Sequence, residues 1–370
     1  MPSVVHIDTS RTWRGGQLQV FLLHRELIRL GVGSRLLTRK DGALHLRCEE
    51  SGVPVEPVPF LRLWYPPAVF TVWRKTLRSQ IVHAHDSHAV ALAAVARSVN
   101  PQLAVVCHRR IAYRPSGVLS DRWKYRHVDR WIAVSSEIAA VLRDVGVGVD
   151  ELRIVPSAVD IEELQQQTTE NTADRLRSEF SIGAGSRVVG LVGALAPQKG
   201  HEALIAAAPS ILEAAPDTVF LCVGEGRLRA RLQREVRRRG FESAFRFTGF
   251  RRDVPSLMGL CTVIVAPSLD GEGSSAVIKE AMMLGTPVVV SDLPGNTEVL
   301  GGAGVAIPVS DTATLADAVV MMLQDSNCRL DLGAVGQSQY EQWFPSTMAA
   351  GVLGAYDGLG QSVALASETI

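Results

Sequence analysis

The sequence lacks the features that indicate a membrane-spanning helix or a disulfide scaffold. Its longest apolar run extends only over Ala89 to Ala96, well short of the roughly 18 residues that cross a bilayer. Its five cysteines are odd in number, widely separated and without a Cys-x-x-Cys pair, so neither a disulfide framework nor structural zinc is expected. No charged and then apolar leader precedes Val4, and we expect an unprocessed, cytoplasmic chain.

Net charge is also lacking, although the two halves of the chain differ. The 38 basic and 38 acidic residues cancel over the whole chain. Residues 1–170 contain 22 Lys and Arg against 17 acids, and the remainder contains 16 against 21. The basic N-terminal half suggests an acidic partner there, and no nucleic-acid partner is expected.

The length of 370 residues favours two domains of roughly 170 to 200 residues each. Short apolar β-branched segments alternate with helical periodicity, and a glycine turn follows a strand in each half. This pattern predicts two doubly wound α/β domains. We place the first at residues 1–165 and the second at 175–344, with the polar segment 163–174 as the linker between them.

One strand-helix-strand unit lies between Val263 and Leu300. Its first strand should be 263–266, and a helix capped by Ser274 or Ser275 should end at Gly285. The start of such a helix offers unpaired N–H groups and a partial positive charge, which suit a phosphate.

Two carboxylates in this unit have no packing explanation. Glu272 precedes the helix and Glu280 lies within it. Glu272 could accept hydrogen bonds from hydroxyls on one side of a phosphate and Glu280 from a diol on the other, as a nucleotide sugar would require. The alternative is a capping loop followed by a surface helix with an exposed glutamate.

The segment PSLDGEGSSAVIKEAMMLGTPVVVSD resembles the signature of the retaining glycosyltransferases of family 4. Pro267-Ser268, Glu272, Glu280-Ala281-Met282, Gly285 and Pro287 stand in register with that pattern. The resemblance implies that Glu272 contacts the donor sugar as a catalytic residue and that Glu280 binds the nucleotide ribose. It also implies that Gly273, Ser274 and Ser275 hold the donor.

The same resemblance assigns roles elsewhere in the chain. Lys199 is implied to be a catalytic cation facing the donor phosphates, and His108, at the end of the strand LAVVCH, a catalytic residue touching the sugar. Further donor-binding residues would be Gly15, Gly16, Gly224, Phe250 and Arg251. One departure is Ala194, where many members have an Arg, so that Lys199 alone, or another residue such as Arg251, must stabilise the leaving diphosphate.

Three features of the N-terminal half have more than one interpretation. His83, His85 and His88 could hold a metal, but no nearby Cys or Glu completes a set, and we expect no metal site. Aromatic and basic residues alternate over 60–79, which fits either an anionic bilayer surface or an amphipathic helix with an aromatic core face. The arginine-rich segment after His108 fits a phosphorylated acceptor, bound by Arg109, Arg110 and Arg114.

By resemblance, the chain should therefore adopt the GT-B fold, with two Rossmann-like domains facing across a cleft and residues 345–370 crossing back to the first. The implied reaction moves a sugar from a UDP-, GDP- or ADP-linked donor to a glycan or lipid-linked acceptor hydroxyl, with retention. No Asp-x-Asp pair is present, so a metal-independent reaction without a cofactor is expected. The enzymes it most resembles build lipopolysaccharide or other surface glycans, which suggests the inner face of the membrane. Alternatives are a nucleotide-sugar epimerase of the same fold and a catalytically silent sugar-nucleotide binder.

Overall fold

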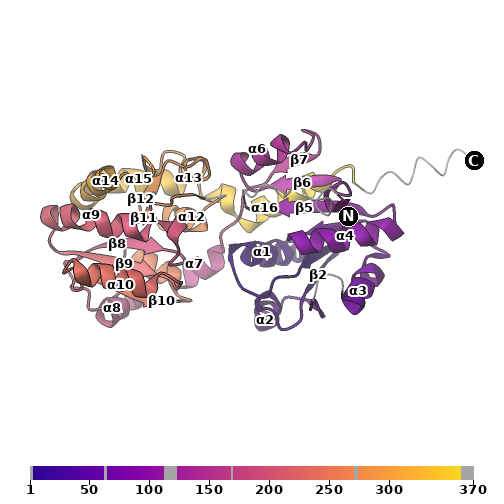
Figure 1. Cartoon of the computed structure of the whole chain (residues 1–370), viewed down its shortest axis with the longest axis horizontal. Helices are drawn as coiled ribbons and strands as arrows, with labels where there is room; N and C mark the ends of the chain where they lie inside the picture. The colour runs from indigo at the N-terminus through magenta and orange to yellow at the C-terminus, as the bar shows by residue number, and fades with distance from the viewer. Residues whose placement is uncertain (1–2, 62–64, 112–122, 168–169, 271–273, 360–370) are drawn as a thin grey trace, which may run out of the picture. The chain divides into compact units, whose positions relative to one another are not determined.

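The computed structural model describes residues 3–61, 65–111, 123–167, 170–270 and 274–359 (Figure 1). The chain divides into two compact units, Met1–Ala158 with Pro345–Ile370, and Val159–Phe344. The segment 163–174 does not form the expected linker, because it lies largely in helices α7 (Ile161–Gln167) and α8 (Glu170–Glu179) of the second unit.

The first unit is built on a seven-stranded parallel sheet with the order β3-β2-β1-β4-β5-β6-β7. Its inner strands are apolar on both faces, as a sheet covered by helices on both sides requires. The strands are β1 (Val4–Asp8), β2 (Ser34–Arg39), β3 (Glu56–Val58), β4 (Ile81–Ala84), β5 (Ala104–Arg109), β6 (Arg130–Ala133) and β7 (Leu152–Ile154). The helices are α1 (Gly15–Arg29), α2 (Ala43–Glu50), α3 (Pro66–Thr76), α4 (Ser87–Val99), α6 (Ser136–Asp144) and α16 (Pro345–Tyr356).

The end of the chain returns to this first unit, as expected. Helix α16, yellow in Figure 1, packs against α1 and contributes Met348, Val352 and Tyr356 to the buried cluster beneath it. The side-chain amide of Gln19 in α1 pairs with the backbone of Ala158, donating at 2.8 Å and accepting at 2.7 Å. These contacts fix the two points at which the chain leaves the first unit after Ala158 and returns to it at Pro345.

The second unit contains a six-stranded parallel sheet with the order β10-β9-β8-β11-β12-β13. The strands are β8 (Arg187–Val192), β9 (Thr218–Val223), β10 (Phe245–Gly249), β11 (Val263–Ala266), β12 (Val288–Ser291) and β13 (Gly304–Ile307). Besides α7 and α8, the helices are α9 (His201–Ala214), α10 (Arg229–Arg238), α11 (Val254–Gly259), α12 (Ala276–Met283), α13 (Pro294–Leu300), α14 (Thr312–Gln324) and α15 (Ser326–Ser338), with 3₁₀ turns η1 (Pro197–Lys199) and η2 (Tyr340–Trp343). Both units are therefore doubly wound α/β domains, as the sequence predicts.

The strand-helix-strand unit also forms where expected. Strand β11 leads through a loop to α12, and Gly285 follows the helix with a φ of 70°. Ser275 occupies the N-cap position, but its side chain makes no capping hydrogen bond. The first turn of α12 therefore keeps backbone N–H groups without a side-chain cap.

Candidate active site

The candidate donor site of the second unit begins where strands β8 and β9 end. Gly224 has a φ of 139°, and a Cβ at this position would lie 2.0 Å from the carbonyl oxygen of Gly193. Backbone hydrogen bonds join Gly193 to Val223 at 2.9 Å and Gly224 to Gly249 at 3.0 Å. Close backbone contact between the neighbouring loops therefore requires a glycine at position 224, independently of any ligand binding.

Lys199 lies at the end of η1 and is half-buried. Gly200, with a φ of 70°, packs so tightly that a Cβ would lie 1.8 Å from the carbonyl oxygen of Pro267. The backbone N–H of Leu269 donates to Gln198 at 2.9 Å. These contacts place the lysine-bearing turn against the loop that runs from β11 towards α12.

The start of α12 contains a buried cation. Lys279 is fully buried, and its Nζ donates to Ser274 Oγ at 2.7 Å. Burial lowers the pKa of Lys279 to about 7, although the nearby Glu298 and Glu280 act in the opposite direction. No sequence pattern singled out this lysine, because a single basic residue in a helix is usually exposed.

Glu280 is half-buried and lies beside Asp160 and Glu163 at the start of α7. Burial raises the pKa of Glu280 to about 7, and these two carboxylates raise it further by repulsion, against a smaller opposing effect of Lys279. A carboxyl group with such a pKa changes charge near neutral pH, which a glutamate exposed on a surface helix does not do.

The loop after β10 presents Phe250 and Arg251. Phe250 is 72% exposed, a large apolar surface without a covering side chain. The guanidinium of Arg251 donates to Asp253 at 2.7 and 2.8 Å and to Glu179 at 2.5 Å, and these bonds raise its pKa. Arg251 is therefore engaged by two carboxylates and would have to break these bonds to serve a diphosphate. The expected residues Glu272, Gly273 and Arg114 lie outside the described residues.

The candidate site of the first unit lies at the corresponding edge of its sheet. Asp8 ends β1, accepts from Gln17 Nε2 at 2.9 Å and from the backbone of Ser10 at 3.0 Å, and is almost fully buried. Burial and the neighbouring Asp86 raise the pKa of Asp8 to about 6. Gly15 and Gly16 open α1, and Arg14 at the N-cap position provides no side-chain cap.

Four histidines form a buried cluster behind this edge. His6 and His83 are register partners on β1 and β4, and His6 Nδ1 lies 2.9 Å from His85 Nε2. The ring of His108 stacks on that of His83 at 5.3 Å and 6°. Burial lowers the pKa of all four, and their mutual repulsion or that of Arg110 lowers it further, so that they are neutral at pH 7.

The sequence analysis missed one histidine of this cluster and a tyrosine that contacts it. His6 lies in β1, which the sequence did not mark as part of a site, and Tyr356 of α16 contacts the cluster through a 2.6 Å hydrogen bond with His83 Nδ1. The alternation of His6 with buried Val5 and Ile7 could have placed it on one face of its strand, whereas Tyr356 is too distant in sequence for any local signal. His88, the third histidine of the expected set, is separate from the cluster and packs edge-on against Phe60.

The cluster does not fit a divalent metal, although His6, His83 and His85 have ligand atoms within 4.8 Å of one another. Arg110 Nη2 lies 3.1 Å from His85 Nδ1, and a guanidinium can only donate. A histidine bound to metal through Nε2 carries its proton on Nδ1, where it would oppose the Arg110 N–H. The positive charge of Arg110 would also repel the ion.

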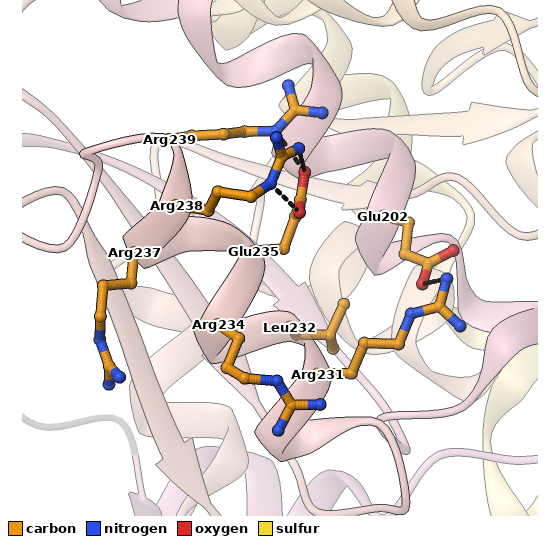
Figure 2. A pocket seen from close by; sticks show the side chains of 8 residues that line it. All are labelled: Glu202, Arg231, Leu232, Arg234, Glu235, Arg237, Arg238 and Arg239. Carbon is orange, nitrogen blue, oxygen red and sulfur yellow. Dashed lines mark hydrogen bonds and ion pairs between the residues drawn. The ribbon is translucent and has the colours of Figure 1, made fainter.

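The arginine-rich helix α10 is largely a solvated surface. Leu232 and Val236 are buried, while the arginines line a surface hollow of about 760 Å³ (Figure 2). Arg231 pairs with Glu202 at 3.0 Å, and Arg238 and Arg239 both pair with Glu235. These ion pairs neutralise much of the local positive charge.

Helix α3 does not have the aromatic core face that the sequence suggested as one alternative. Its buried residues are Ala68, Val72 and Thr76, whereas Phe70 is 56% exposed and lies against Trp73 at a ring distance of 5.5 Å. Small residues fit the close α3–α4 packing better than large rings. Among the described residues, the structure contains no helix with the length and apolarity needed to traverse a bilayer.

Comparisons with known proteins match both halves of the chain. The family model described as "Glycosyltransferase Family 4" matches residues 13–163, and that described as "Glycosyl transferases group 1" matches residues 186–325. Among solved structures, the HepE protein of Anabaena in complex with UDP aligns with a TM-score of 0.84 at 22% identity, covering 96% of this chain and 100% of HepE. This likeness confirms the GT-B fold class.

Two relatives extend over most of the chain. A 2-deoxystreptamine N-acetyl-D-glucosaminyltransferase of Streptomyces fradiae is 31% identical over 348 residues, which is 82% of this chain and 81% of the relative. A phosphatidyl-myo-inositol mannosyltransferase of Mycobacterium leprae is 29% identical over 323 residues, 83% of this chain and 82% of the relative. The chain is a glycosyltransferase and belongs to family 4.

Proposed function

We propose that this glycosyltransferase is a retaining enzyme that moves a sugar from a nucleoside diphosphate to an acceptor hydroxyl without a metal ion. The observation that best supports this proposal is the packing of the Lys199–Gly200 turn against Pro267. It brings a cation to the loop that leads to the uncapped N-terminus of α12. A lysine and a set of backbone N–H groups together suit a diphosphate.

In the proposed reaction, the bond between the anomeric carbon and the phosphate oxygen breaks while the acceptor oxygen bonds to the same face of the sugar. The acceptor proton passes to the departing phosphate oxygen, so that the products are the glycoside and the nucleoside diphosphate. Lys199 and the N–H groups of α12 stabilise the charge that grows on the leaving diphosphate. No protein nucleophile is required.

The sugar and the nucleotide need different partners. In this proposal Glu280 accepts hydrogen bonds from the ribose diol, Glu272 accepts them from the sugar hydroxyls, and His108 contacts the sugar. Phe250 offers an exposed ring beside the nucleobase. We take UDP-glucose as the first donor to test, because HepE was crystallised with it.

The names of the relatives suggest a class of acceptor. The names of the two relatives given above include 2-deoxystreptamine and phosphatidyl-myo-inositol, and each of these compounds contains a polyhydroxylated six-membered carbon ring. We therefore propose a cyclic polyol as the acceptor. Assembly of lipopolysaccharide or another surface glycan, on the inner face of the membrane, stays a prediction, with the exposed Phe70 as a candidate contact with lipid.

The experiment is a transfer assay with UDP-, GDP- and ADP-sugars and a panel of polyols, followed by NMR of the product. An α-linked product from an α-linked donor supports retention, and activity in excess EDTA supports a metal-independent reaction. Lys199→Ala should lower turnover by about a hundredfold or more, as the loss of an electrostatic stabiliser does. Arg234→Ala removes a charge from exposed α10 and is the matched control. Release of UDP with an epimerised free sugar would favour the epimerase, and donor binding without turnover would favour the silent binder.

A further inference from the structure

Arg110 is a charged residue of the first unit that makes few hydrogen bonds with the other described residues. It follows β5 and is half-buried, and its Nε has no hydrogen-bond partner within the described part of the chain. Among the described residues, its guanidinium makes one side-chain hydrogen bond, to His85 Nδ1. Of the five N–H donors of this guanidinium, only one on Nη2 meets a side-chain acceptor among the described residues, so the others can bind a ligand.

The acidic residues nearby do not supply that partner. Asp8 and Asp86 attract Arg110 through space, but their oxygens accept other hydrogen bonds. Asp86 accepts from the backbone and hydroxyl of Thr9 at 2.7 and 3.0 Å and from the backbone of Ala89 at 2.8 Å, and Asp8 accepts from Gln17 and Ser10. Both carboxylates are therefore turned towards their own loops.

The bond from Arg110 determines where the protons of the histidine cluster lie. Because a guanidinium only donates, His85 Nδ1 is the acceptor and the proton of neutral His85 is on Nε2. His85 Nε2 then donates to His6 Nδ1, which places the proton of His6 on its own Nε2. Arg110, His85 and His6 form one directed chain of hydrogen bonds, anchored in the interior of the sheet.

The described residues around Arg110 leave space beside the start of α1. A Cβ at Gly16 would lie 4.0 Å from Arg110 Cδ, and a Cβ at Gly15 would meet no atom of the described residues within 4 Å. Neither glycine has a positive φ, so neither the backbone nor the packing requires glycine here. The bare, uncapped start of α1 thus lies beside the guanidinium.

We propose that Arg110 is a phosphate-binding residue of the glycosyl-transfer site and that the His85–His6 pair is the positioning device that orients its guanidinium. This inference rests on the proposed function and adds an oxyanion to the substrate bound by the first unit. The phosphate has two sources, an anionic group on the acceptor or the diphosphate of the donor. A planar guanidinium held from behind by one acceptor presents its remaining N–H groups in a fixed direction, which favours a tetrahedral oxyanion.

Calorimetric titration with inorganic phosphate, at constant ionic strength, tests the proposal in the full chain. Phosphate should bind wild type, and Arg110→Met should weaken this binding by about tenfold or more, as the loss of hydrogen bonds to a charged group does. Arg110→Lys keeps the charge without the fork and should fall between them. Circular dichroism establishes that each variant is folded. Equal phosphate affinity in wild type and Arg110→Met, or no phosphate binding to wild type, overturns the proposal.

Repeating the titration with saturating UDP distinguishes the two sources. Binding that persists with UDP present and is lost in Arg110→Met supports an anionic group on the acceptor. Binding that UDP abolishes, together with a weaker UDP affinity in Arg110→Met, supports the donor diphosphate. The proposed function fails separately, if no sugar donor is turned over by wild type that still binds phosphate through Arg110.

Two histidine variants test the positioning role. His85→Gln offers an amide oxygen to Arg110 and should retain most of the phosphate affinity, whereas His85→Leu offers no acceptor and should lose about tenfold. Long-range ¹H–¹⁵N spectra should show unprotonated Nδ1 atoms in His85 and His6, and Arg110→Met should alter the His85 signals. Equal phosphate affinity in the two variants, or a protonated Nδ1 on His85, overturns this part.

Discussion

Replacement of Glu280 by Gln should stabilise the fold at pH 8 and weaken donor binding at the same pH. Burial raises the pKa of Glu280 from 4.5 to about 7, so the folded chain binds a proton between these values that the unfolded chain has released. The free energy of unfolding therefore falls as pH rises from about 4.5 to 7, and the full penalty of the charged carboxylate is present above pH 7. The Glu280→Gln variant has no such charge to bury.

The size of both effects follows from this shift. Its upper bound is about 3 kcal/mol at pH 8, and we expect about 1 to 2 kcal/mol because the side chain is only half-buried. For the donor, the ribose diol donates to the ionised carboxylate. About one tenth of Glu280 is ionised at pH 6 and about nine tenths at pH 8, so donor affinity should rise about tenfold between these pH values.

The assay is calorimetry with UDP-glucose at pH 6, 7 and 8, combined with thermal unfolding of both proteins. UDP-glucose is preferable to UDP, since a terminal phosphate itself titrates near pH 6. The affinity of the Glu280→Gln variant should be low and independent of pH. Glu163→Gln removes one of the repelling carboxylates and should move the midpoint of the wild-type profile to lower pH. A flat wild-type profile, or a Glu280→Gln variant that is less stable at pH 8, would refute the reasoning.

Three further substitutions separate packing from function. Tyr356→Phe leaves buried His83 Nδ1 without its partner and should cost about 1 to 3 kcal/mol in urea unfolding, and an equal loss in a His83→Phe background would contradict the assigned bond. Gly224→Ala should destabilise the chain strongly in thermal unfolding, because its Cβ would lie 2.0 Å from a carbonyl oxygen. Gly15→Ala, at an open position of α1, should leave the melting temperature unchanged or higher while lowering transfer activity; a lower melting temperature would show that this glycine serves the fold.

The fold was predictable because its signals are local. Parallel strands covered on both faces appear as short apolar runs, and glycine or proline punctuates the helices between them, as at Gly285 and Pro287. The linker was misplaced because polar residues and threonines at 163–174 resemble a loop in composition. Tertiary packing of Leu164 and Leu176 stabilises helices α7 and α8, which include 163–167 and 170–174.

The site was less predictable, because its chemistry depends on contacts between distant segments. The sequence placed Lys199 and Glu280 in plausible motifs, but the pKa of Glu280 depends on Asp160 and Glu163, more than a hundred residues earlier. The sequence named Arg110 and His85 separately. It gave no signal for the buried Lys279, for His6 or for the hydrogen bonds that join Arg110 to His6, because solitary basic residues and histidines occur on many strands and helices by chance. Motif matching locates residues, whereas burial and hydrogen-bond direction are properties of the folded chain.

Ala194 stands where many family members have an arginine, so another residue must stabilise the leaving diphosphate in the proposed reaction. Ala194 is exposed, so nothing in its packing excludes an arginine there. Arg251, the expected substitute, is engaged by Glu179 and Asp253 and would have to break these ion pairs to contact a diphosphate. We therefore propose that Lys199 and the start of α12 stabilise the leaving diphosphate.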